Sequence, residues 1–141
     1  MPADESILEM MKQGMGYTDE EWEEWKADPR NMSVAERMPE FMKYRVVVEV
    51  LEAHGCAIRH KPGDKFYFNA SGALQCKKGV QNICAGALMP VLPFAMGVLD
   101  KIAAGVDPTK YRFNRFQCVD IGLDKGGWGK ILMEARVEKK E

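Results

Sequence analysis

The spacing of apolar residues changes near residue 44. In residues 1–43 apolar side chains recur at helical spacing behind polar capping residues, with an amphipathic stretch at 6–15. Two Ser/Thr-x-x-Glu sequences, at 18–21 and 33–36, have the form of a capping box, which satisfies free amides at a helix start. The pattern therefore predicts three short helices, beginning near residue 6, after Thr18 and after Ser33.

Beyond residue 44 the apolar residues alternate, which is typical of half-buried strands. Four such segments are present, YRVVVEVLEA, KFYFN, YRFNRFQCVD and KILMEARVE, and turn sequences rich in Gly, Pro or Asp separate the members of each pair. Between the pairs lies an apolar segment of helical character, residues 83–105, in which Pro90 and Pro93 cannot donate to a continuous helix. We expect a short helix, a kink and a longer helix there.

These elements predict an α+β fold. Its body, residues 44–141, is expected to be a small, mainly antiparallel sheet covered by the kinked apolar helix. Residues 1–43 are expected to form a helical N-terminal arm that is acidic and rich in Met and Trp. Its large apolar side chains are Met10, Met11, Met15, Trp22, Trp25, Met32, Met38 and Met42.

Charge is divided unevenly between the two parts. The arm carries 11 acidic and 5 basic residues and the body 10 and 15, so a net charge of −1 conceals values of −6 and +5. Either the arm folds onto its own body or it docks on a protein partner or a second copy of the chain. The basic residues are scattered and no nucleic-acid-binding motif is present, which argues against nucleic acid as a partner.

Nothing in the sequence predicts a membrane protein. The chain does not open with a basic segment followed by an apolar one, and Pro90, Pro93 and Asp100 interrupt its most apolar stretch. We therefore expect a cytoplasmic protein.

Candidate chemistry rests on four cysteines. Cys56, Cys76, Cys84 and Cys118 all fall at predicted element ends, which can converge at one edge of a sheet. In a cytoplasmic chain such cysteines favour metal binding or catalysis over disulfides. Their gaps lack the close pairs of a zinc ribbon and suit an iron–sulfur cluster, although Cys56 and His60 are also suitable as two ligands of a zinc site.

Each candidate ligand has a plainer interpretation. A free cysteine often serves as a small core residue, and Cys118, which shares a strand face with Phe116, is the clearest case. A loop histidine such as His60 more often bonds to backbone than to a metal. Cys84 differs because it opens a helix, where exposed amides stabilise a thiolate.

Three segments, GCAIRHKPGDKF, ICAGALMPVLPFAMGVL and FQCVD with its following strand, resemble a family of small, functionally uncharacterised bacterial and archaeal proteins. The resemblance covers about residues 44–137 and leaves the arm outside it. The matching residues are Cys56, His60, Gly63, Asp64, Cys84, Pro90 or Pro93, and Cys118. Val119 stands where the family often has proline, and Cys76 has no firm counterpart. The resemblance implies a shared cysteine site and no particular reaction.

The sequence favours a small metal-binding or iron–sulfur-cluster-binding accessory subunit of a larger, anaerobic redox or radical enzyme. The alternatives are a stand-alone enzyme using an activated cysteine or an open metal position, and a zinc-stabilised interaction module. Only two histidines, His54 and His60, are present, and no Gly-rich nucleotide-binding loop occurs, so a catalytic assignment has less support.

Overall fold

A computed structural model describes residues 2–140; Met1 and Glu141, the outer ends of the predicted arm and body, lie outside the described residues. The arm consists of α1 (Glu5–Met15), α2 (Asp19–Ala27), α3 (Pro29–Glu36) and α4 (Met38–Phe41). The capping box predicted at Thr18 is confirmed, because the Thr18 hydroxyl accepts the Glu21 amide proton and the Glu21 carboxylate accepts that of Thr18.

The capping box predicted at Ser33 is wrong. The helix begins five residues earlier than predicted, with the Asp28 side chain accepting the Arg30 amide proton and Pro29 in the first turn. A proline at that position has no amide proton to satisfy and a backbone angle already suited to a helix. Ser33 therefore lies inside α3, where its hydroxyl donates to the Pro29 carbonyl.

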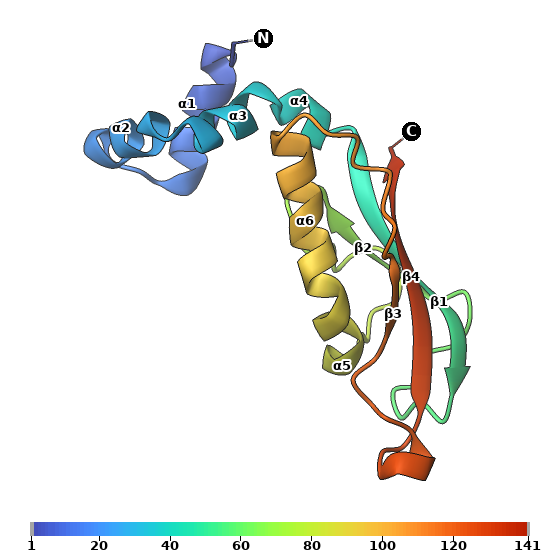
Figure 1. Ribbon diagram of the computed structural model, residues 1–141. Helices are drawn as coiled ribbons and strands as arrows, with labels where there is room; N and C mark the ends of the chain where they lie inside the picture. Colours follow the sequence, from blue (N-terminus) through green and yellow to red (C-terminus); the bar gives the residue numbers. More distant parts are fainter. Residues whose placement is uncertain (1, 141) are drawn as a thin grey trace.

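The body contains one four-stranded antiparallel sheet in the order β2-β1-β4-β3 (Figure 1). Its strands are β1 (Tyr44–His54), β2 (Lys65–Asn69), β3 (Arg115–Gln117) and β4 (Lys130–Lys139). The predicted α+β class is thus confirmed. The third strand is much shorter than the alternation over 111–120 predicted, and it ends one residue before Cys118.

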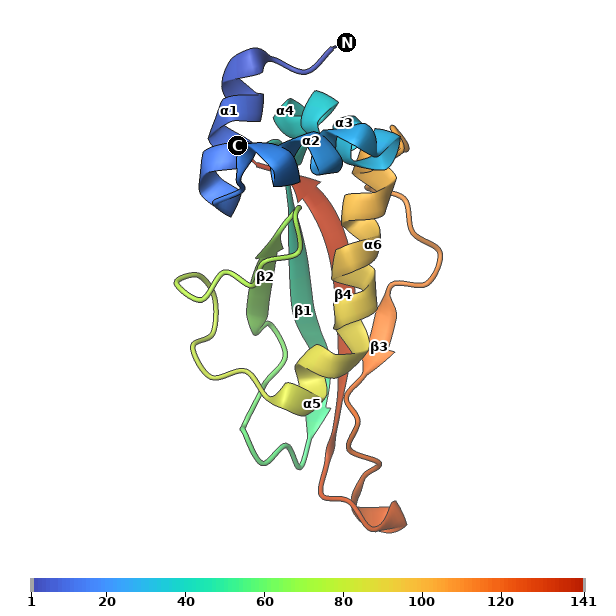
Figure 2. The same cartoon turned by 90° about the vertical axis from the view of Figure 1, so that its left-hand side faces the viewer.

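One helical layer covers the sheet and has the predicted break. It is formed by α5 (Ala85–Leu88), a 3-10 turn η1 (Met89–Val91) and α6 (Leu92–Ala103), which lie along one face (Figure 2). Pro90 lies in η1 and Pro93 in the first turn of α6, where a missing amide proton costs no hydrogen bond.

The core fills the space between these layers. Buried residues of the sheet include Val46, Val48, Val50, Phe66, Phe68, Ile131, Met133, Ala135 and Val137, and those of α6 are Phe94, Ala95, Val98 and Ile102. By length and composition alone, the stretch 85–103 also qualifies as a candidate membrane span. In this fold the stretch supplies six of the buried core residues: Ala87, Val91, Phe94, Ala95, Val98 and Ile102.

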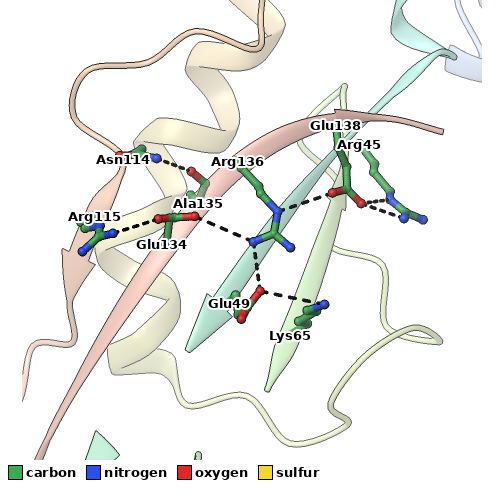
Figure 3. A network of polar contacts seen from close by, with 9 residues as sticks. All are labelled: Arg45, Glu49, Lys65, Asn114, Arg115, Glu134, Ala135, Arg136 and Glu138. Carbon is green, nitrogen blue, oxygen red and sulfur yellow. Dashed lines mark hydrogen bonds and ion pairs between the residues drawn. The ribbon is translucent and has the colours of Figure 1, made fainter. Parts of the chain in front are cut away.

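The opposite face of the sheet carries a ladder of alternating charges (Figure 3). The Arg136 guanidinium contacts the carboxylates of Glu49 and Glu138 at 3.0 and 3.5 Å, and Arg45 contacts Glu138 at 2.8 Å. Cross-strand pairs of opposite charge stabilise a sheet modestly and keep its open face soluble.

A register shift in β1 determines where the first cysteine lies. Val50 pairs with Met133 but Glu52 pairs with Leu132, so Leu51 is an extra residue, a β-bulge. Paired residues share a face, and the bulge therefore keeps Ala53, the partner of Ile131, on the core face. The chain leaves β1 at His54 and enters the loop that carries Cys56.

Only the second half of the arm packs on the body. Ala35 of α3 and Phe41 of α4 are buried, and Phe41 belongs to the main core. By contrast, α1 has no buried residue, and Trp22 of α2 finds cover mainly by stacking on Trp25 at 4.9 Å between ring centroids. Helices α1 and α2 project from the body (Figure 1).

Tyr111 packs between α6 and the sheet, and its hydroxyl lacks a hydrogen-bond partner within residues 2–140. Its ring lies 4.2 Å from that of Phe94, centroid to centroid, while its buried hydroxyl has no partner among the described residues. Burial raises the pKa of this hydroxyl, with the nearby Asp100 carboxylate adding to the effect.

Replacing Tyr111 with Phe should leave the free energy of unfolding unchanged or raise it by about 1 kcal/mol, because it removes an unpaired buried hydroxyl and keeps the ring. Tyr111→Leu, the control, should destabilise the fold by losing the ring contacts. Urea denaturation of both variants measures this. A clear loss of stability in Tyr111→Phe would show that the hydroxyl has a partner.

Candidate functional site

Three of the four cysteines meet at one pocket. Cys56, Cys84 and Cys118, together with His60, line a cavity of about 430 Å³ whose other walls are mostly apolar or small residues. The residues that line the pocket come from the end of the sheet where β1 ends and β4 begins and from α5; Figures 1 and 2 show where these elements lie. Cys56 and Cys118, which are 62 positions apart in the chain, thus line the same cavity.

Cys76 is the exception. It is exposed in the loop between β2 and α5 and is not among the residues that line the pocket. Its thiol makes only a long contact, 3.9 Å, with the Leu74 carbonyl oxygen. The structure therefore separates Cys76 from the other three candidate ligands.

A histidine joins the Cys56 loop to α5. The backbone amide of Cys84 donates to Nε2 of His60 at 3.2 Å, and the imidazole is buried. Cys84 is the N-cap of α5, where a backbone amide has no partner within the helix. The bond satisfies that amide and holds the Cys84 backbone against the loop that carries Cys56.

A glycine pair joins the same loop to the start of β4. Gly55 has φ of +68°, and a Cβ there would lie 2.8 Å from the Trp128 carbonyl oxygen. A Cβ on Gly129 would overlap the backbone of Gly55 and His54. Because the two backbones touch directly, neither position has room for a side chain. This contact places Cys56 next to the β3–β4 connection.

A third tie joins α5 to the segment that carries Cys118. The Val119 amide donates to the Gly86 carbonyl oxygen at 3.1 Å, and a Cβ on Gly86 would lie 2.8 Å from Cγ2 of Val119. The Cys118 amide donates to the Ile131 carbonyl, and the Ile131 amide lies 3.4 Å from the Cys118 sulfur. A separate contact thus joins each two of the three segments that carry Cys56, Cys84 and Cys118.

Asp120 organises the loop that follows Cys118. Its carboxylate accepts amide protons from Gly122, Trp128 and Gly129 at 2.9–3.1 Å. These hydrogen bonds, with that of Gly122 the largest contributor, lower the pKa of Asp120 below its usual value. The carboxylate lines the pocket, but its oxygens are already engaged by backbone.

The mouth of the pocket has an apolar rim. Ile58, Val119 and Trp128 line the cavity and are largely exposed, Trp128 to 71%. Cys56, Cys84 and Cys118 themselves are half-buried and make contact with the main core. The thiols therefore face a cavity that is open to solvent but has apolar walls.

The spacing of the candidate ligands bears differently on a single metal ion and on a metal cluster. In residues 2–140, no group of three or more His, Cys, Asp or Glu side chains is close enough together to hold a single metal ion. Zinc needs its thiolates within about 2.3 Å of one point. A [4Fe–4S] cluster is bound differently, because each thiolate binds a different iron atom and the thiolates approach the cluster from separate sides. The three cysteines that line the cavity offer the donor type that such clusters use.

Several residues that build the site were missing from the sequence prediction. Gly86 and Gly129 act through close backbone approach, and Asp120 acts through amides up to nine residues away. The position of Asp120 two residues after a cysteine and before a Gly-rich turn was the available signal, since Asp commonly accepts amides in such turns.

Comparison with known proteins gives no match to a protein family, a curated protein or a solved structure.

Replacing Gly129 with Ala should destabilise the protein by about 2 kcal/mol or more, because the new methyl group overlaps backbone that cannot rotate away. Gly14→Ala is the matched control. It lies in α1 with open space around it and should be neutral or stabilising by up to about 1 kcal/mol. Thermal unfolding measures both. Equal effects of the two variants would contradict the close contact between the ends of β1 and β4.

Proposed function

We propose that this protein is a small iron–sulfur-cluster-binding accessory subunit, with Cys56, Cys84 and Cys118 as cluster ligands. The observation that carries the proposal is that these three cysteines line one cavity while Cys76 lies outside it. Cysteines acting only as core residues have no reason to face the same cavity from three separate segments. Zinc is the alternative metal, and binding it requires the three thiols to move closer together.

A cluster at this site supplies one-electron transfer or structural stabilisation. The residues of the chain provide the environment for it. The walls of the pocket are mostly apolar, and the Ile131 amide donates toward the Cys118 sulfur. Hydrogen bonds to ligand sulfurs and solvent exposure are two of the properties by which proteins adjust cluster potentials.

A stand-alone thiol enzyme has less support. One common route to an activated cysteine is a base that takes the thiol proton. Nε2 of His60, which lines the pocket, already accepts the Cys84 amide proton. The other histidine, His54, pairs with Lys130 in the sheet. It is exposed and is not among the residues that line the pocket.

The arm supports a role as a subunit. Met10 and Met15 of α1 are exposed to 59% and 42%, and no side chain of that helix is buried. Flexible methionine side chains among acidic residues suit a surface that another protein covers. We propose that α1 docks on a partner protein of the cytoplasmic, anaerobic enzyme or on a second copy of this chain.

Protein purified without oxygen should contain iron and sulfide. Cys56→Ser, Cys84→Ser and Cys118→Ser should each lose most of the bound iron, whereas Cys76→Ser should retain it because Cys76 lies outside the pocket. Metal analysis and the visible absorption spectrum measure this. Stoichiometric zinc without iron would favour the zinc alternative, and equal iron loss in Cys76→Ser would contradict the three-thiol site.

Replacing Met10 and Met15 together with Glu should abolish association while leaving the fold intact, because both side chains are exposed and neither contributes to the core. Met96→Glu, on the exposed side of α6, is the matched control and should associate normally. Sedimentation of the native assembly measures this. A wild-type chain that is monomeric at all concentrations and without partners in its host would rule out the docking surface.

A further inference from the structure

We infer that His60 is a positioning residue that holds Cys84 in place, and that it does not bind the metal. The metal part of this statement rests on the proposed function, whereas the positioning part concerns the chain alone. The inference revises the ligand set expected from the sequence, in which His60 and Cys76 accompanied the other three cysteines. The ligands that this pocket offers are then three thiols.

The two ring nitrogens of His60 have different partners. Nε2 accepts the Cys84 amide proton at 3.2 Å, so it carries no proton of its own. In the neutral ring the proton is then on Nδ1, which faces Oδ2 of Asp64 at 3.6 Å. A metal ion needs the same unprotonated nitrogen that the Cys84 amide already uses.

Asp64 is itself fixed to the sheet. Its Oδ2 accepts the Lys61 amide proton at 3.1 Å, and its carbonyl accepts that of Val50 in β1 at 2.8 Å. The neighbouring Gly63, with φ of +92°, donates its amide proton back to the Val50 carbonyl at 2.8 Å. These contacts fix the turn and the Asp64 carboxylate to β1, beside the imidazole that accepts the Cys84 amide proton.

Burial makes this arrangement costly to change. His60 is only 6% exposed, and it is the one buried polar or charged residue identified in the described part of the chain. Turning its ring toward a metal leaves the Cys84 amide without its partner. Asp120, the carboxylate residue that lines the pocket, is likewise held by three backbone amides. A fourth ligand to the metal therefore comes from outside these side chains.

The test begins with the metal-free wild-type protein, which needs no variant to fold. Nitrogen-15 NMR of the histidine ring should show the proton on Nδ1 of His60. Amide exchange at Cys84 should become about tenfold faster in His60→Ala, as expected for loss of one hydrogen bond of about 1.4 kcal/mol. The Cys118 amide, bonded to Ile131, is the internal control and should not change. A proton on Nε2, or unchanged exchange at Cys84, overturns the positioning role.

The metal-loaded protein supplies the second measurement. His60→Gln keeps an oxygen that can accept the Cys84 amide proton, so it should retain wild-type metal content, while Cys84→Ser should lose it. If His60→Gln loses as much metal as Cys84→Ser while its Cys84 amide stays protected from hydrogen exchange, His60 is a ligand. That result overturns the inference. A wild-type protein that binds neither iron nor zinc refutes the proposed function, and the NMR result then stands as a separate answer on positioning.

Discussion

The pairing of β1 with β4 is the constraint on which the site depends. The two strands run side by side from Tyr44 opposite Lys139 to His54 opposite Lys130, so the end of one must meet the start of the other. At that point the Gly55 and Gly129 backbones touch, and the chain turns from there into the Cys56 loop. The bulge at Leu51 keeps the alternation correct up to this end. Without it, Ala53 would face the charged side of the sheet and the following loop would leave on the wrong face.

The core and the pocket are stabilised by different interactions. The core depends on apolar burial between the sheet and α6, at about 25 cal/mol for each Å² removed from water. The pocket depends on single links between segments: the His60 bond to Cys84, the Val119 bond to Gly86 and the glycine contact. Losing one of these leaves the core intact and changes the separation of the thiols. Under the proposed function, metal binding would add stability to the state in which all three links are formed.

The sequence was most informative where local chemistry decides structure. Alternation in 44–53 and 65–69 identified β1 and β2, and the prolines at 90 and 93 identified the break before α6. The Ser33 capping box failed because Asp28 and Pro29 offer an earlier and better helix start. The shared pocket was foreseeable because the four cysteines fall at predicted element ends, but that reasoning also included Cys76, which does not line the pocket. The role of His60 was left open, because its partner is a backbone amide 24 residues away that only the tertiary fold brings near.

The arrangement of the two ends of the molecule bears on how an accessory subunit of this kind would work. The acidic arm projects from the end of the sheet where β1 begins, whereas α5 and the β3–β4 connection lie at the other end (Figures 1 and 2). Helix α1 and the residues that line the thiol pocket therefore belong to opposite ends of the molecule. In the single chain, the apolar rim of Ile58, Val119 and Trp128 faces solvent. Under the proposed function, docking and metal chemistry are separable in this chain: α1 determines what the protein binds to, and the three linked segments determine what the pocket holds.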